Sequence, residues 1–348
     1  MSKKRIIISA VLIVLLAGLV YLQFREWRRF NWHVFFERTQ DANAIYLATA
    51  VALIYVDYVL RAIRWKLFLK PVCEVSWRRL LAPTMIGFTG IALLGRPGEF
   101  VRPYVIARKE NLTMSSQMAV WAVERIFDTG AFALLVALDL VLAPSLRSLP
   151  HYEGFRNAGF ILLAGVVAMS LFLFLLYRNT EGMALWAEKR FTHAPHFAHR
   201  TALRIREFGS GLRTIHTVGH FFKLLGISMV VWLVIAASYL QVVHAYGGEL
   251  GRMHISQVIL LMGSAMIGSV VQLPAVGGGT QLATIGMLHY VFDVRPESAA
   301  SCGMMIWLIT FMMVIPVGLI LAHREHISLR QVTQDVASVA EVEPERAP

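Results

Sequence analysis

Residues 255–292 read ISQVILLMGSAMIGSVVQLPAVGGGTQLATIGMLHYVF, and this stretch constrains the fold more than any other. It is longer than the roughly 20 apolar residues that cross the hydrocarbon of a bilayer as a helix. Pro274 and the run 277–279, three glycines, interrupt it. Lipid cannot satisfy the backbone groups that such a break releases, so the break must be buried in protein or face a wet cavity. The stretch is therefore predicted to be a re-entrant hairpin.

A second interrupted stretch precedes it in the chain. Residues 80–95, LLAPTMIGFTGIALLG, are apolar and are followed at once by Pro97-Gly98. The same argument predicts a second re-entrant hairpin.

Uninterrupted apolar stretches surround these two hairpins. With 57% hydrophobic and only 16% charged residues, the chain has too few charges for an ordinary soluble surface. The fold class expected is all-α: a polytopic integral membrane protein with about six transmembrane helices plus two re-entrant helical hairpins. An uncleaved anchor is expected at the N-terminus, with a processed signal peptide as the alternative. The six predicted spans are 6–23, 43–61, 117–142, 157–177, 221–244 and 300–322.

The distribution of basic residues predicts the orientation. Loops and tails on one side carry 23 Lys and Arg residues against 8 on the other. Loop 23–42 does not fit this pattern well, because it lies on the less basic side and carries four arginines. The positive-inside rule then places both termini in the cytoplasm. With that orientation the second half (157–322) repeats the first (1–142) upside down, which is the pattern of secondary transporters whose two breaks meet near the midplane. The tail 323–348 is expected to be disordered.

Several classes of function are disfavoured. Cys73 and Cys302 have no ligand spacing, and the histidines of HAPHFAHR (193–200) are expected to form a solvated basic loop, so no metal or cofactor is predicted. Nucleic acid is disfavoured because the basic residues, which give a net charge of +11, lie in short loops between apolar spans. The polar segment 178–220 is too short for an appended catalytic domain.

The first break carries charged candidates. Arg96, Glu99 and Arg102 surround Pro97-Gly98, and arginine matches phosphate oxygens in a bidentate manner. These three residues are predicted to bind an anionic lipid headgroup. The alternative is a basic loop at the cytoplasmic interface.

The second break offers backbone amides. Gly277, Gly278 and Gly279 precede a helix, with Gln281 in its first turn, and such an arrangement can hold an anion without a cation. Binding of substrate is predicted here too. A plain tight turn is the alternative.

Charged residues also occur within two predicted spans. Glu124, Arg125 and Asp128 are predicted to be either a charge relay or a structural pairing set, facing the protein interior in both cases. Asp57, Arg61 and Arg64 form one helical stripe beside Trp65 and are predicted to anchor that span at the membrane interface; a role in the headgroup entrance is the alternative.

These motifs occur in the order found in a known family. From RAIRW (61–65) through GRPGEFVR (95–102) and ERIFD (124–128) to LPAVGGG (273–279), residues 43–322 resemble the transmembrane, flippase-like domain of lysylphosphatidylglycerol synthases. The resemblance implies a stand-alone member without an aminoacyl-transferase domain. A glutamate that often follows the glycines in that family is replaced here by Thr280.

The resulting hypothesis is a lipid translocase for an anionic or phosphate-bearing phospholipid or glycolipid in the cytoplasmic (inner) membrane of a prokaryote. Membrane lipids are the expected partners. The chain has no ATP-binding motif, so uphill transport would need an ion gradient or the membrane potential. Two alternatives remain: a membrane-embedded glycosyl- or acyl-transferase using Glu99 or Asp128, and a non-catalytic partner of a separate lipid-modifying enzyme.

Overall fold

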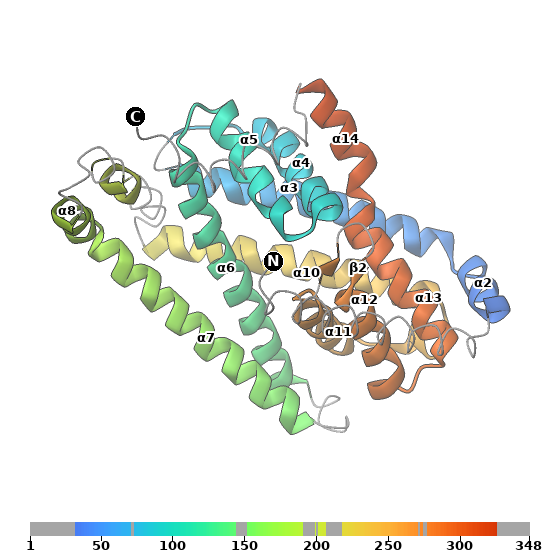
Figure 1. The fold of residues 1–348 in the computed structure, drawn as a ribbon. Coiled ribbons are helices and arrows are strands. Elements are labelled where there is room, and N and C mark those ends of the chain that lie inside the picture. Colours follow the sequence, from blue (N-terminus) through green and yellow to red (C-terminus); the bar gives the residue numbers. More distant parts are fainter. Residues whose placement is uncertain are drawn as a thin grey trace, which may run out of the picture.

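The described part of the protein is helical, apart from one pair of two-residue strands (Figure 1). A computed structural model describes residues 32–70, 73–143, 152–190, 199, 201–206, 218–270, 272–273 and 277–325, so the predicted span 6–23, most of the histidine loop and nearly all of the tail lie outside it. The all-α prediction is confirmed. The elements are α2 (Trp32–Gln40), α3 (Ala44–Leu69), α4 (Trp77–Leu94), the 3-10 helix η1 (Arg96–Phe100), α5 (Val101–Lys109), α6 (Met114–Leu142), α7 (Tyr152–Arg178), α8 (Thr180–Arg190), α10 (Val218–Ala245), the 3-10 helix η3 (Leu250–Arg252), α11 (Ile255–Gly268), β1 (Gln272–Leu273), β2 (Gly277–Gly278), α12 (Gly279–Gly286), the π-helix η4 (Met287–Val291), α13 (Pro296–Trp307), the π-helix η5 (Leu308–Met312) and α14 (Val314–Arg324).

The predicted spans that fall within the described ranges coincide with long helices. They correspond to α3, α6, α7, α10 and the continuous run from α13 through η5 to α14. Three helical stretches of the described chain are both long and apolar enough to cross a membrane: Ala44–Leu69, Gly219–Ala245 and Pro296–Arg324.

Helices α3 and α10 pack side by side at the centre of the protein and run antiparallel (Figure 1). The amide of Asn43, just before α3, donates to the carbonyl of Ala245 at the end of α10, at 2.8 Å. Further along the pair, the hydroxyl of Ser238 donates to the carbonyl of Ala50 at 3.0 Å. An apolar core that includes Ile54 and Val242 surrounds this pair.

The first interrupted stretch folds as a helical hairpin. Helix α4 ends at Gly95, whose φ of +69° turns the chain, and after η1 the helix α5 packs back against α4. Gly98 lies directly on the backbone of Gly90, where a Cβ atom would collide with the Gly90 carbonyl. The hairpin is therefore closed by backbone contact between two glycines.

The second interrupted stretch also returns on itself. Strands β1 and β2 pair antiparallel, with Gln272 opposite Gly278, and α12 then packs against α11. Gly268 at the end of α11 lies against the carbonyl of Gly279, again too close for a Cβ atom. Both hairpins thus use the same glycine-to-glycine closure.

The two halves of the described chain contain the same order of elements. The first has α3, the hairpin α4–α5 and α6, and the second has α10, the hairpin α11–α12 and the run α13–α14. The hairpin of each half packs against the last helix of the other, α4 against α14 and α11 against α6. Each hairpin therefore packs against the other half of the described chain.

Candidate functional site

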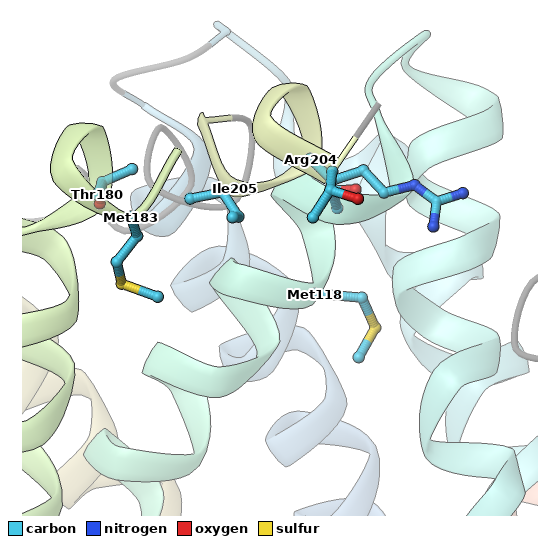
Figure 2. Close-up of a pocket in the computed structure, with 7 residues that line it drawn as sticks. Met118, Thr180, Met183, Arg204 and Ile205 are labelled. Carbon is cyan, nitrogen blue, oxygen red and sulfur yellow. The ribbon is translucent and has the colours of Figure 1, made fainter. Parts of the chain in front are cut away.

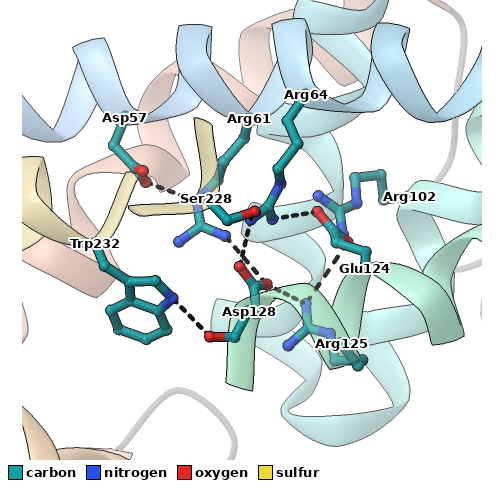
Figure 3. Close-up of polar contacts among 9 residues, drawn as sticks. All are labelled: Asp57, Arg61, Arg64, Arg102, Glu124, Arg125, Asp128, Ser228 and Trp232. Carbon is teal, nitrogen blue, oxygen red and sulfur yellow. Dashed lines mark hydrogen bonds and ion pairs between the residues drawn. The ribbon is translucent and has the colours of Figure 1, made fainter. Parts of the chain in front are cut away.

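A cluster of buried arginines and carboxylates ties α3, α5 and α6 together (Figure 3). Its centre is Arg64, whose side chain is 0% exposed. The Arg64 guanidinium donates to Asp128 Oδ1 at 2.5 Å, to Glu124 Oε1 at 2.7 Å and to the Ser228 hydroxyl at 3.1 Å. Charges are held away from water when they are paired and hydrogen-bonded, and the partners of Arg64 come from two other helices, α6 and α10.

Arg102 enters the same cluster from the first hairpin. Its guanidinium pairs with the second oxygen of Glu124 and lies 4.2 Å from the centre of the Trp65 ring. Gly87 of α4 makes room, because a Cβ atom there would collide with the Arg102 side chain. Arg102, predicted to bind a headgroup, is thus buried and paired within the protein.

The charged stripe on α3 packs inside the protein. Asp57 and Arg61 form the local pair that their i, i+4 spacing suggested, at 2.7 Å, and Arg61 also approaches Asp128 at 3.8 Å. Asp57, Arg61 and Arg64 are all buried in the protein and do not lie at its rim. Helix α3 continues to Leu69, beyond the predicted end of the span at residue 61, so the stripe lies inside the helix, and its role as an interface anchor stays a prediction.

Glu124 and Asp128 face the protein interior, as predicted, whereas Arg125 beside them is only partly buried and makes only long ion pairs. The nearest carboxylate oxygens, on Glu124 and Asp128, lie 3.9 and 4.0 Å from Arg125. The side chain of Arg125 is 38% exposed, in contrast to Arg64 and Arg102. Arg125 is therefore the arginine of the cluster that can accept a new anionic partner at least cost.

A cavity of about 320 Å³ adjoins this cluster. Both hairpins contribute to its wall, Phe88 and Ile91 from α4, and Ala265 of α11 with Ser269 just after it. Both breaks border this cavity, because Glu99 of the first and Thr280, just after the glycines of the second, also line it. The charged residues in the lining are Asp57, Arg61, Glu99, Arg125 and Asp128.

Three buried polar atoms of cavity-lining residues have no hydrogen-bond partner in the described ranges. They are Asp57 Oδ1, Arg125 Nε and Trp307 Nε1. Trp307 stands at the start of the π-helix η5, and π-turns inside α-helices are frequent at functional sites. Buried polar groups are normally satisfied, so water or a polar ligand in the cavity would complete the hydrogen bonds of these atoms.

The remaining predicted residues lie around the breaks. Arg96 is exposed and donates to the carbonyl of Val270 at 3.2 Å, which links the first break to the end of α11. The amide of Gly278 donates to the Gln281 side chain at 3.3 Å, so Gln281 caps the start of α12. Gly277 forms β2 with Gly278, and Gly279 begins α12.

Sequence reasoning missed Ser228, Trp307 and Thr280 as site residues. Thr280 lines the cavity and directly follows the glycines, so its position beside the break was a usable signal. Ser228 and Trp307 lie in apolar helices with no local signal, and only the packing of the helices brings them to the site.

Another pocket lies apart from the cluster (Figure 2). It has a volume of about 370 Å³ and lies between the start of α6, the start of α8 and the segment 201–206. Met118, Met183 and Ile205 give it an apolar lining, with Arg204 at its side (Figure 2). Across the described ranges, no three His, Cys, Asp or Glu side chains gather as a possible metal site.

Comparison with known proteins identifies two relatives. A UPF0104 membrane protein of Methanothermobacter thermautotrophicus is 25% identical over 298 residues, which cover 80% of this chain and 85% of the relative. The glycosyltransferase AglD of Haloferax volcanii is 33% identical over 106 residues, which cover 29% of this chain and 16% of that enzyme. No solved structure matches the chain significantly. Residues 6–318 match the family described as the lysylphosphatidylglycerol synthase TM region, and the chain is therefore a membrane protein belonging to that family.

Proposed function

We propose that the protein is a flippase-like carrier that moves a phosphate-bearing lipid across the cytoplasmic membrane. The observation that carries the proposal is the charged cavity of about 320 Å³ at which the two broken hairpins meet. Ionisable groups inside a membrane are costly and by default mark a substrate pathway. Broken helices that converge between two structurally similar halves are the usual construction of a transporter site.

Arg125 is the residue that we assign to the phosphate group. It lines the cavity, its ion pairs are long, and its Nε atom lacks a partner in the described chain. A guanidinium can donate two parallel hydrogen bonds to phosphate oxygens, which fixes both position and orientation. Arg64 and Arg102 instead hold Glu124 and Asp128 in place and act as the scaffold of the site.

The proposal includes a membrane orientation. The charge distribution places both termini in the cytoplasm, so the first hairpin would enter from the cytoplasmic face and the second from outside. The antiparallel packing of α3 and α10 supports halves of opposite orientation, since these helices occupy equivalent places in the two halves.

The partial similarity to AglD favours a second candidate, a membrane-embedded glycosyltransferase. Glu99 and Asp128 line the same cavity and could act as a base. The matched segment covers only 16% of the length of AglD, so the activity of that whole enzyme is not a basis for assigning one here. Turnover of a glycosyl donor by the purified protein, without lipid movement, would favour this candidate.

A liposome assay tests the carrier proposal. The purified protein is reconstituted into vesicles that contain a fluorescent phosphatidylglycerol, and dithionite is added to bleach the outer leaflet. The expected result is that the inner-leaflet label also becomes accessible, and that Arg125→Gln slows this step about tenfold or more, which corresponds to the loss of a charge-assisted hydrogen bond. Arg78→Gln, at an exposed arginine, serves as the matched control. Protected inner-leaflet label with the wild-type protein would refute the proposal.

A further inference from the structure

An apolar groove of about 490 Å³ lies beside the charged cavity, between α6, α7 and α11. Phe132 and Val136 of α6 form its floor, and Gly263 of α11 leaves it open. The one polar side chain in its lining, Ser264, donates its hydroxyl hydrogen to the backbone carbonyl of Leu261 at 2.7 Å and so is satisfied internally. The groove therefore offers no free polar group from its lining to a ligand.

The groove and the cavity are adjacent to one another. Met266 lines both of them. On α6, Arg125 and Thr129 line the cavity, and Phe132 and Val136 line the groove. These four residues are spaced four, three and four apart, so they lie along one face of the helix. One helix face thus passes from charged to apolar within three turns.

The outer edge of the groove is open to the surroundings of the protein. Ile161 of α7 and Ile267 of α11 both line it, and each is 73% exposed. In a membrane these exposed apolar side chains contact lipid. A chain lying in the groove could therefore enter from the bilayer sideways, between α7 and α11.

We propose that this groove holds an acyl chain of the carried lipid while the phosphate of the same molecule lies against Arg125 in the cavity. This inference rests on the proposed function and specifies how the lipid is held. The matching feature is the order of the surfaces: the charged cavity and the apolar groove adjoin at Met266, as a charged headgroup adjoins an apolar chain in a lipid.

Photochemical crosslinking tests the assignment. The probe is a phosphatidylglycerol that carries a diazirine near the end of one acyl chain, at a low fraction in phosphatidylcholine vesicles that contain the full-length protein. The expected crosslinks fall on Phe132, Val136 and Ile267. Unlabelled phosphatidylglycerol should compete for these sites, whereas diacylglycerol, which has the same chains without the phosphate, should not.

Variants separate a bound lipid from the general lipid that surrounds any membrane protein. Arg125→Gln should lower the groove crosslinks about tenfold, because a specific lipid is anchored by its headgroup and surrounding lipid is not. Gly263→Leu should place a side chain in the groove and so lower the groove crosslinks. There is room for this side chain, since a Cβ atom at position 263 has only Phe132 Cζ as a neighbour, at 3.9 Å. Gly226→Leu, on an exposed part of α10 where a Cβ atom meets nothing, is the control and should change neither crosslinking nor transport.

The outcomes are distinct. Groove crosslinks that ignore both the phosphatidylglycerol competitor and Arg125→Gln would show surrounding lipid only and would overturn the inference, even if the protein moves lipid. Crosslinks that depend on Arg125 without any lipid movement would support the binding arrangement and refute the proposed transport. If Arg125→Gln does not fold, the competition experiment on the unaltered protein still decides.

Discussion

Arg64 is the most deeply buried arginine of the cluster. It is fully buried and bonds to two carboxylates of α6 and to Ser228 of α10. Removing one partner of a buried ion pair leaves the other charges uncompensated, which typically costs about 3–5 kcal/mol. Arg64 is therefore expected to act mainly on stability.

Arg64→Met tests this expectation. The variant should melt at a clearly lower temperature in detergent than the wild type, because Glu124 and Asp128 lose their main partner. Arg78→Met provides the comparison, since Arg78 is exposed and lies over the ring of the adjacent Trp77, at 5.6 Å from its centre. Equal melting temperatures for the two variants would contradict the scaffold role.

For single residues, the burial of the carboxylates could be predicted from the sequence, but their ion-pair partners could not. The spacing of Glu124 and Asp128 along an apolar helix was enough to predict that they face the interior, since charge is costly in lipid. The pairing of Arg64 and Arg102 with these carboxylates was not predictable, because α3, α5 and α6 meet only through long-range packing. A charge whose partner is far away in the sequence carries no local pattern.

At the scale of elements, the two hairpins are the features that the sequence predicted most directly. Proline and glycine interrupt apolar stretches at both positions, and the structure contains helix–break–helix units at both. The contacts that close the hairpins could not be predicted, because nothing in the sequence indicates that Gly98 touches Gly90 or that Gly268 touches Gly279. Helix α3 also continues to Leu69, beyond the apolar stretch 43–61 from which the span was predicted.

Gly98→Ala and Gly268→Ala test the hairpin closures. In each case a methyl group must displace a backbone carbonyl, and such overpacking typically costs about 1–3 kcal/mol. Both variants should lower the melting temperature and slow lipid movement, because the cavity wall shifts with the hairpin. Gly226→Ala is the control, as it meets nothing and should be neutral or stabilising. Unchanged stability in both hairpin variants would contradict the close contacts.

In the whole molecule, the proposed transport requires that the two halves are inserted with opposite orientation. Lys70 lies just after α3 and Glu249 shortly after α10, and both residues are exposed. Because α3 and α10 are antiparallel, these positions are at opposite ends of the helix pair.

Sided labelling measures that orientation. In a background without Cys73 and Cys302, Lys70→Cys should react with a membrane-impermeant maleimide only after the cells are opened, because the loop after α3 is basic. Glu249→Cys should react in intact cells. Labelling of both positions from the same side would contradict the inverted arrangement.

The central claim is that the two breaks enclose a water-filled cavity that receives a phosphate headgroup. The most direct measurement is the reaction of Thr280→Cys, in the background without native cysteines, with a small charged methanethiosulfonate. Thr280 lines the cavity, whereas Leu282 on the same helix is 63% exposed and is expected to face lipid, so Leu282→Cys is the control. We expect that Thr280→Cys reacts, that phosphatidylglycerol but not diacylglycerol protects it, and that Leu282→Cys does not react. A Thr280→Cys thiol that is inert, or that reacts equally with and without phosphatidylglycerol, would contradict the claim.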